Sequence, residues 1–493
     1  GGKEAILTIQ VVLIKAEPWA AVGHEVAWEQ SAVPIAHEAV PAAPPPTDDC
    51  REMRVDVSDK EVVVTSGDVR ATWCTERGGL ATLSVGGKQL VGGSAEDVLR
   101  HNFWRAQTCN DNGGSDTLTR YGATEQHYPP ECGFPTAHPR SAALIRYVVK
   151  WLHFWSDISY GGMWEKAGLD QLYPTQVDVK VLRRGVTDCG TEQWSAGPGV
   201  SVGLVKVETS YMLRSKGTST RIPCRTVYQI SPTGEIVLDN ECYYTPALPP
   251  PARIGLELAV PGALQRLCWF GRGPHESYPD RLGVAVGQYE ERVDDTFVKY
   301  IVPQENGNKC ETRWAALVGD DGCGLMVSAG APGETFNVSA HRFKAMDLQK
   351  ARHCKEVMQR HDVTVTIDHR HTATGGNTSW TRAQMPQFLI PKGTYSYSIR
   401  LSPIMSTAAI ARPEPLAPPL TARTSEFKPP GVLCGLWHRM LWDASLAIGH
   451  SPILLVETIL EVTSSSVTVP VVWAVVSVGA VFALRTLQRS RAA

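Results

Sequence analysis

Among the carboxylates between Trp269 and Trp314, the candidates for chemistry are Glu276, Asp280, Glu305 and Glu311. A carboxylate in a loop can act as an acid, a base or a nucleophile. It can equally brace the loop by accepting bonds from backbone N–H groups. No recognisable catalytic motif surrounds these four side chains. The residues alone therefore favour loop-bracing carboxylates in two structural corners of a β domain.

The backbone of this stretch is conformationally special. Phe270–Pro274, FGRGP, combines two glycines with a proline. Glycine supplies positive φ and proline fixes φ, so this run predicts a defined turn. A second turn is predicted at residues 303–308, PQENGN, after a polar, strand-like stretch. Special loops of this kind are often functional loops.

Residues 270–281, FGRGPHESYPDR, are followed by PQENGNK at 303–309 and TRW at 312–314. This long, ordered set strongly resembles the C-terminal domain of β-galactosidases of glycoside hydrolase family 2. The resemblance covers roughly residues 5–40 and 51–403. It implies a large antiparallel two-sheet β-sandwich of the galactose-mutarotase type, a supersandwich, which closes one side of the active-site mouth.

Residues 102–114, NFWRAQTCNDNGG, resemble the family motif in which NFWRAP leads into an Asn-Asp turn and a mobile loop. In the family that loop lies beside the galactose pocket. The resemblance implies that Asn110, Asp111 and Gly113 contact or border the sugar. Gln107 stands where the family has proline and Cys109 where it has aspartate, and either change could alter the rigidity of the loop.

The run GGNTSW ends at Trp380 and resembles the family motif GG-x-x-SW, whose tryptophan reaches the active site. An aromatic ring suits a sugar because the axial C–H edge of a pyranose is apolar. From position alone, a core tryptophan after a glycine turn is the default, since buried aromatic residues are common. The resemblance reverses that preference and implies a substrate-binding Trp380.

Retaining glycoside hydrolysis needs two carboxyl groups ~5–5.5 Å apart. In the family both are glutamates on a TIM barrel, and no segment here shows the alternating βαβα pattern of a barrel. We therefore expect no catalytic residue and no cofactor in this chain. The family's magnesium and sodium ligands also lie outside the matching stretch.

The resemblance implies that the chain is the C-terminal part of a β-galactosidase. Its expected partners are a galactoside substrate and the catalytic barrel of the same enzyme. The alternative is a non-catalytic, membrane-tethered carbohydrate-binding module. Mutarotase-like chemistry would need a histidine and a glutamate facing one pocket, and no such motif is visible. The sequence leaves the oligomeric state open, a homo-oligomer included.

Short alternating runs separated by glycine-rich turns predict an all-β fold. The expected strands are residues 5–14, 25–30, 61–65, 69–74, 80–85, 88–91, 176–182, 202–211, 225–230, 235–239, 254–260, 314–318, 324–327 and 395–401. Hairpin turns are expected at residues 231–234 and 319–322.

The predicted domains follow composition and the resemblance. Residues 1–40 are expected to end an immunoglobulin-like sandwich, 41–50 form a linker, and 51–403 form the supersandwich with an insertion at about 115–162. Residues 404–430 are a Pro-rich linker and 431–493 an apolar tail. The opening Gly1-Gly2-Lys3 carries no signal peptide, and we interpret the chain as a fragment of a longer polypeptide or an incomplete gene.

The chain has 493 residues, 43% of them apolar and 20% charged, with a net charge of −2. This composition is that of a globular protein and indicates no nucleic-acid partner. The 12 cysteines include no Cys-x-x-Cys pair, which argues against a zinc site.

The tail contains an uncharged run at residues 467–484 that is long enough to be a transmembrane candidate. Arginines follow it, so the positive-inside rule predicts a single-pass membrane protein with the β domain lumenal or extracellular. A cytoplasmic protein with a buried helix is the alternative. Asn337 and Asn377 begin glycosylation sequons that would be accessible outside the cell.

Overall fold

The computed structural model describes residues 5–33, 51–93, 97–111, 159–186, 192–331, 333–376 and 384–405. The chain divides into two compact units, Gly1–Val40 with Glu414–Ala493, and Pro41–Pro413. In the described part of the first unit, β1 (Ala5–Val12) pairs antiparallel with β2 (Glu25–Val33), which confirms the two strands predicted there.

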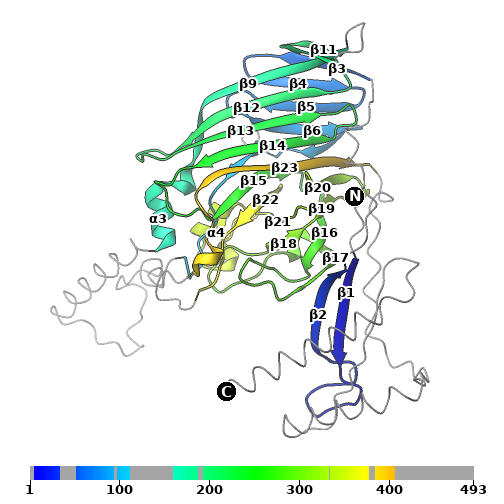
Figure 1. Cartoon of the computed structure of the whole chain (residues 1–493), viewed down its shortest axis with the longest axis vertical. Coiled ribbons are helices and arrows are strands. Elements are labelled where there is room, and N and C mark those ends of the chain that lie inside the picture. The colour runs from blue at the N-terminus through cyan, green and yellow to red at the C-terminus, as the bar shows by residue number, and fades with distance from the viewer. Residues whose placement is uncertain are drawn as a thin grey trace, which may run out of the picture. The chain divides into compact units, whose positions relative to one another are not determined.

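The largest sheet in the described part of the second unit has ten strands, every neighbouring pair antiparallel (Figure 1). Its order is β10 (Glu192–Ala196), β9 (Tyr173–Val186), β12 (Val205–Arg214), β13 (Arg221–Ile230), β14 (Ile236–Tyr244), β23 (Gly393–Ile404), β20 (Gly324–Ala329), β19 (Trp314–Val318), β16 (Arg266–Gly273) and β17 (Ala285–Arg292). Strand β23 therefore joins the half of the sheet that ends in β14 to the half that begins with β20.

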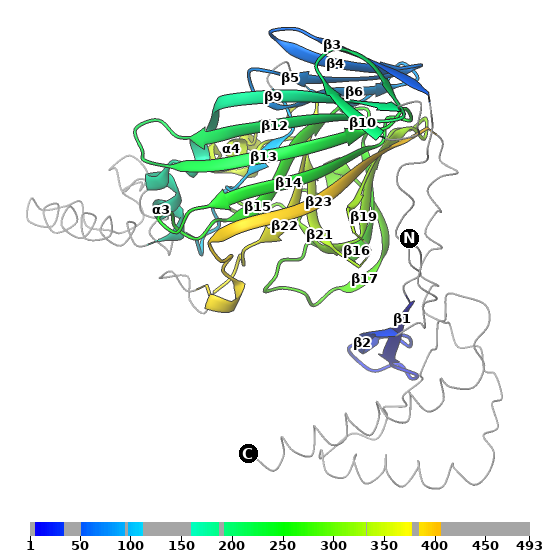
Figure 2. The same cartoon turned by 45° about the horizontal axis from the view of Figure 1, so that its top comes forward.

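Two smaller antiparallel sheets accompany it in the described residues (Figure 2). One runs β11 (Gly199–Val202), β3 (Glu52–Val57), β4 (Glu61–Ser66), β5 (Val69–Cys74), β6 (Gly79–Val85) and β7 (Lys88–Val91). The other runs β18 (Lys309–Thr312), β21 (Phe336–His341), β22 (Val363–His371), β15 (Arg253–Val260) and β8 (Arg100–Asn102). The two meet where the Gly92 N–H donates to the Ala259 carbonyl at 2.9 Å.

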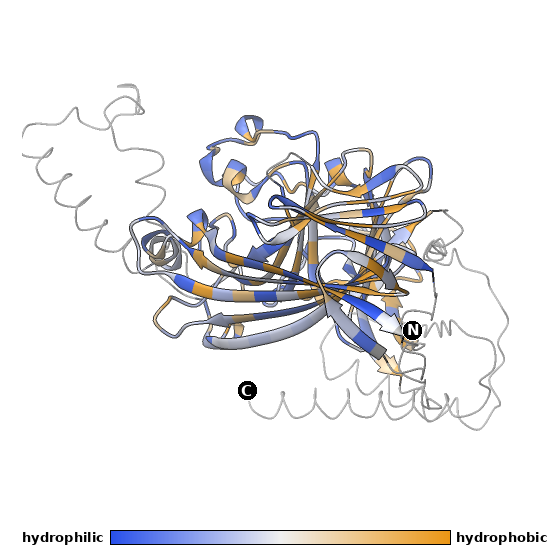
Figure 3. Ribbon diagram, turned by 90° about the horizontal axis from the view of Figure 1, so that it is seen from above, coloured by the Kyte–Doolittle hydropathy of each residue, from blue (hydrophilic) through white to orange (hydrophobic). Residues whose placement is uncertain are grey.

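The core lies between the ten-stranded sheet and the smaller sheets. Successive residues of β12 alternate between buried and half-buried, because side chains of a strand point to opposite faces. Figure 3 shows the same alternation of hydrophobic and hydrophilic residues along the strands. The Trp73 ring of β5 stands edge-on to Tyr228 of β13, with centroids 5.7 Å apart. The predicted all-β class with antiparallel sheets is confirmed.

The helices in the described residues are short. They are α3 (Tyr160–Ala167), α4 (Ala345–Lys350) and the 3₁₀ turns η2 (Leu169–Gln171), η3 (Val293–Asp295), η4 (Cys354–Glu356) and η5 (Pro386–Phe388). Helix α3 begins where Ser159 Oγ accepts the Gly162 N–H at 3.0 Å, and it ends at Gly168, whose φ is 65°.

The predicted membrane localisation must be corrected. Within the described residues no helix is long and apolar enough to cross a membrane. Helices α3 and α4 have eight and six residues, whereas a spanning helix needs about 20 apolar residues. The segment 467–484, on which the prediction rested, lies outside the described residues, as does most of the predicted insertion at 115–162.

The predicted turn at Phe270–Pro274 is wrong for its first four residues, which belong to strand β16. Gly271 and Gly273 do not have positive φ. Their lack of a side chain instead leaves room for closely packed neighbours. A Cβ at Gly271 would lie 2.9 Å from the Thr312 Cα, and one at Gly273 would lie 2.8 Å from the Trp269 ring. The chain bends from Pro274 onward.

Candidate functional site

Four loops that lie far apart in the sequence are bonded to one another in the structure. They follow β8, follow β16, lead into the first residue of β18 and follow β22, and they comprise residues 105–111, 274–281, 303–309 and 372–376. We call them the four motif loops, because each contains part of a sequence motif described above. The hydrogen bonds that connect them define the candidate site.

Asp280 connects the second loop to the fourth. Its carboxylate accepts the backbone N–H of Thr374 at 3.2 Å and that of Gly375 at 2.7 Å. Glu276 connects the second loop to the third, accepting the Gly307 N–H at 2.8 Å and the Tyr300 hydroxyl. These two carboxylates brace the loops through backbone N–H groups, as the sequence predicted.

Glu305 and Glu311 behave differently from the prediction. Glu305 pairs with Arg253, whose Nη2 lies 2.8 Å from its Oε1. Glu311 pairs with Arg272, with 3.0 Å between Oε2 and Nε. Each thus neutralises an arginine side chain. The expectation that they accept backbone N–H bonds is wrong, because the sequence does not reveal which arginine lies opposite.

Asp111 is fully buried and forms an ion pair with the equally buried Arg105, at 2.8 Å. Its carboxylate also accepts the Thr108 N–H at 2.8 Å and the Gln384 amide at 2.6 Å. The Arg105 guanidinium donates in turn to the Ala373 carbonyl at 2.7 Å. The pair therefore fixes the first loop to the fourth from beneath. With its carboxylate so engaged, Asp111 supports the loop surface and does not form part of it.

Asn110 precedes Asp111 in the sequence and is half-buried. Its Nδ2 donates to the Thr374 carbonyl at 3.0 Å. The neighbouring Cys109 is exposed, and its N–H donates to Gln304 Oε1 of the third loop at 3.2 Å. Gln107 anchors the same loop to α3, since its Nε2 donates to Glu165 Oε1 at 2.8 Å. Its backbone N–H donates to Gln349 Oε1 at 2.8 Å, a bond that proline could not make.

A buried charged cluster lies behind the third and fourth loops. Arg253 pairs with Glu305 and also approaches Asp368, with 3.4 Å between Nη1 and Oδ2. His371 Nε2 is 3.6 Å from Glu305 Oε1. The Tyr278 ring packs on His371, with centroids 5.3 Å apart. All five side chains are buried, so the charges of Arg253, Glu305 and Asp368 interact strongly.

The two carboxyls of this cluster titrate in opposite directions. Burial raises the pKa of Asp368 to about 7, with the Glu305 charge adding to the rise, although Arg253 opposes it. Burial would also raise the pKa of Glu305, but Arg253 and His371 outweigh it and lower that pKa to about 2. Burial lowers the pKa of His371 to about 4. The cluster therefore holds an ionised Glu305 beside an Asp368 that protonates near neutrality.

The candidate site provides polar, well-braced loops. Every carboxylate of the four motif loops has a fixed partner. No group of three or more His, Cys, Asp or Glu side chains in the described ranges could hold a metal ion. The arrangement thus offers polar groups to a ligand at the surface of the loops.

Of the remaining predicted residues, the structure describes only Asn337. Gly113, Asn377 and Trp380 lie outside the described residues. Asn337 lies in β21, where its Nδ2 donates to the Asp368 carbonyl at 3.3 Å. Sequence reasoning missed Arg105 and Arg253. Arg253 pairs with Glu305 and with Asp368, which lies 115 residues away. Arg105 pairs with Asp111 in its own loop and also donates to the Ala373 carbonyl of the fourth loop, and no local pattern indicates these long-range contacts.

The fold and the site together define an all-β protein whose loops are braced into one polar surface. Residues 65–401 match the family described as "Beta galactosidase small chain", and residues 1–34 match "Beta-galactosidase, domain 4". The first match covers more than half of the chain, so the chain belongs to the β-galactosidase small chain family.

Curated relatives agree with this membership. A β-galactosidase of Vibrio cholerae is 31% identical over 306 residues, which cover 62% of this chain and 24% of that protein. A β-galactosidase of Psychromonas ingrahamii is 27% identical over 417 residues, covering 81% of this chain and 32% of that protein. The chain therefore spans about a quarter to a third of the length of these relatives.

Solved structures are more distant. The galactose 1-epimerase of Lactobacillus acidophilus NCFM aligns with 71% of this chain and 97% of its own, at 9% identity and a TM-score of 0.31. A likeness this weak supports no conclusion about fold or function, so family membership rests on the sequence matches.

Proposed function

We propose that this chain is the C-terminal part of a β-galactosidase that hydrolyses terminal β-D-galactosides with retention, and that the four motif loops shape one side of the active-site mouth. Family membership and the curated relatives support the proposal. The observation that carries it is the bonding of the fourth loop to both Asp280 and Asn110. The motifs that the family resemblance singled out thus form one connected surface.

The proposal gives each predicted residue a role. Asn110 borders the sugar: its Nδ2 is bonded to Thr374, and its Oδ1 is the atom that can accept from a sugar hydroxyl. Asp111 positions this loop from beneath through Arg105. Gly113 borders the sugar with this loop, and Trp380 offers an aromatic face to the sugar. The roles of Gly113 and Trp380 rest on the resemblance.

The catalytic glutamates are proposed to lie on a barrel that this sequence does not include. Retention needs two carboxyl groups ~5–5.5 Å apart with access to the substrate. Glu276, Glu305 and Asp111 each bond to a partner in the fold, and these bonds give the three carboxylates a structural role. They leave the nucleophile and the acid to the barrel, which is then the main partner of this chain.

The finer fold assignment belongs to the same proposal. We infer that residues 51–403 form a galactose-mutarotase-like supersandwich and that residues 1–40 end an immunoglobulin-like sandwich. The ten-stranded sheet packed on two smaller antiparallel sheets supports the first part. The match of residues 1–34 to domain 4 of the family supports the second. The exact domain boundaries stay predictions.

The test is hydrolysis of o-nitrophenyl β-D-galactoside by this chain alone and by its mixture with a barrel-containing N-terminal fragment of a β-galactosidase. We expect activity in the mixture only. Asn110→Ala should raise the KM of the mixture about fivefold or more, because a hydrogen bond to the sugar is lost. Asn337→Ala, which removes a half-buried asparagine outside the motif loops, should leave KM unchanged. Activity of the chain alone would contradict the placement of the glutamates.

A further inference from the structure

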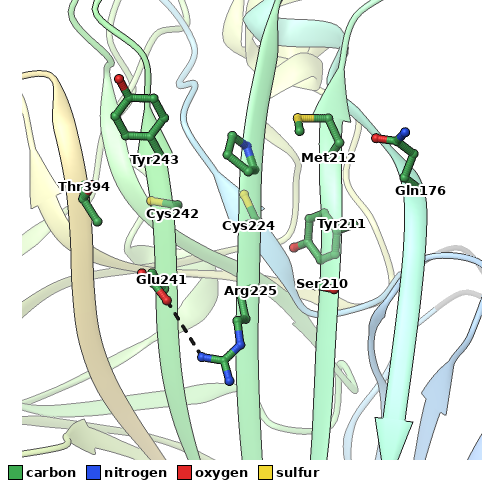
Figure 4. A pocket seen from close by; sticks show the side chains of 11 residues that line it. Gln176, Ser210, Tyr211, Met212, Cys224, Arg225, Glu241, Cys242, Tyr243 and Thr394 are labelled. Carbon is green, nitrogen blue, oxygen red and sulfur yellow. Dashed lines mark ion pairs between the residues drawn. The ribbon is translucent and has the colours of Figure 1, made fainter.

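A groove of about 400 Å³ crosses the ten-stranded sheet on the face that points away from the smaller sheets (Figure 4). It runs over β9, β12, β13, β14 and β23, and it shares no residue with the four motif loops. Figure 4 shows Tyr243, Met212 and Gln176 along one side of it and Glu241, Arg225 and Ser210 along the other.

Strand register arranges these side chains in two parallel rows. In the first row, Met212 is paired with Pro223, and Tyr243 with Thr394 of β23. In the second row, Ser210 is paired with Arg225, and Arg225 with Glu241. The first row is mostly apolar, and its Tyr243 is 45% exposed, whereas the second row is polar. The groove is therefore amphipathic across its width.

The groove is also close to neutral. Arg225 donates to Glu208 Oε1 at 2.8 Å and lies 3.8 Å from Glu241 Oε2. Glu241 would repel an anionic ligand, and Arg225 would repel a cationic ligand. A neutral ligand with many hydroxyl groups meets donors and acceptors of both kinds, because a hydroxyl can donate and accept.

Gln176, at the edge of the groove, has an unusual backbone conformation. It has a φ of 54°, in the left-handed region that favours glycine. It lies in a β-bulge, because Ser210 pairs with Asp178 while Met212 pairs with Thr175. A bulge re-aims a side chain, and residues held in such backbone cluster at functional sites. Glycine would fit this position without strain, so the backbone gives no reason for glutamine.

The Gln176 side chain has no structural use that would explain it. It is exposed, and its amide makes no hydrogen bond within the part of the chain that the structure describes. The bulge is held by another residue, since Thr175 Oγ1 donates to the Met212 carbonyl at 2.9 Å. The amide is thus left free at the edge of the groove.

We propose that this groove binds a neutral saccharide, at a site separate from the motif loops. The apolar C–H face of a pyranose would lie on Tyr243 and Met212. Its hydroxyl groups would bond to the Gln176 amide and to the polar row of Arg225 and Glu241. Sugars combine apolar faces with planar polar partners in this way, and the volume falls within the range of small-molecule sites.

The test uses β-1,4-galactotetraose as the probe and the full chain in isothermal titration calorimetry, with cellotetraose for comparison. Tyr243→Ala and Gln176→Gly should each weaken binding about fivefold or more. Gln176→Gly is the sharper variant, because it relieves the left-handed strain and should keep or raise the melting temperature. Trp194→Ala removes an aromatic ring that lies 4.2 Å from Lys206 Nζ outside the groove, and it should leave binding unchanged.

Three outcomes overturn the proposal. The first is that neither tetrasaccharide binds to the folded chain. The second is binding that Tyr243→Ala and Gln176→Gly leave intact, which would place the saccharide elsewhere. The third is concentration-dependent dimerisation that Tyr243→Ala abolishes without any saccharide binding, which would make the face a contact between two copies of the chain.

Discussion

The carboxylate of Asp280 lies against the backbone of Gly375, whose N–H it accepts at 2.7 Å across 95 residues of sequence. A Cβ at position 375 would lie 2.7 Å from Asp280 Oδ2, so the glycine is needed for this contact. The bond holds the fourth motif loop immediately before the segment that leads to Trp380.

Asp280→Asn should lower the free energy of unfolding by about 1–2 kcal/mol, because a charged acceptor of two N–H groups becomes a neutral acceptor of one. In the mixture with the barrel fragment, the same change should raise KM. Asp56→Asn is the matched control, since Asp56 is exposed and pairs with Arg54 alone. Chemical denaturation and steady-state kinetics provide the two readouts. Equal effects of both variants would count against the bracing role.

Arg105→Met should lower the free energy of unfolding by about 3–5 kcal/mol, because it leaves the Asp111 carboxylate charged and unpaired in a fully buried position. Asp111→Asn should cost less, since the amide still accepts the Thr108 N–H. Urea denaturation followed by tryptophan fluorescence measures both. A loss below about 1 kcal/mol for Arg105→Met would show that the pair is not buried in solution.

The Asp368 carboxyl should make the free energy of unfolding decrease as pH rises from about 4 to about 7. Its folded pKa is raised to about 7 from 3.8, so its contribution is fully present below pH 4 and lost as pH rises to 7. This amounts to about 4 kcal/mol at most. Glu305 acts oppositely, but only below about pH 4.5, because its folded pKa is lowered to about 2.

Asp368→Asn isolates this contribution from the buried histidines, whose pKa values burial lowers to about 4 and whose effect has the opposite sign. The difference in unfolding free energy between the unchanged chain and Asp368→Asn should therefore decrease steadily from pH 4.5 to pH 7. Denaturation curves at five pH values measure it. A difference that does not vary with pH would mean that Asp368 is ionised throughout.

Gly273→Ala should destabilise the chain by about 1–3 kcal/mol, because its Cβ would lie 2.7–2.8 Å from the rings of Tyr289 and Trp269. Gly283→Ala is the matched control in the following loop, where a Cβ meets nothing within 4 Å. Thermal unfolding compares the two. A Gly273→Ala variant as stable as Gly283→Ala would mean that the rings can move apart.

Much of the sheet architecture could be predicted, because β12, β13 and β14 alternate along their length and are joined by short turns. The same alternation of Val363, Val365 and Ile367 was available to predict β22. The glycines of β16 misled the prediction, since their role is close packing against Thr312 and Trp269 and only the folded chain reveals that neighbour.

The candidate site was less predictable than the sheets. Motif resemblance located the loops, and Asp280 and Glu276 brace them as expected. The Arg105–Asp111–Gln384 network spans 273 residues between the aspartate and the glutamine, so no local pattern specifies it. Long-range hydrogen bonds of this kind follow from tertiary packing, which a single sequence does not display.

The central position of β23 has a consequence for synthesis on the ribosome. This strand is made after the other described strands of the second unit, yet it pairs with both β14 and β20. A nascent chain halted before Gly393 would carry two partial sheets with unpaired edges at β14 and β20. Such edges recruit strands from other molecules. Until translation has passed Ile404, the emerging polypeptide is therefore most in need of chaperone protection.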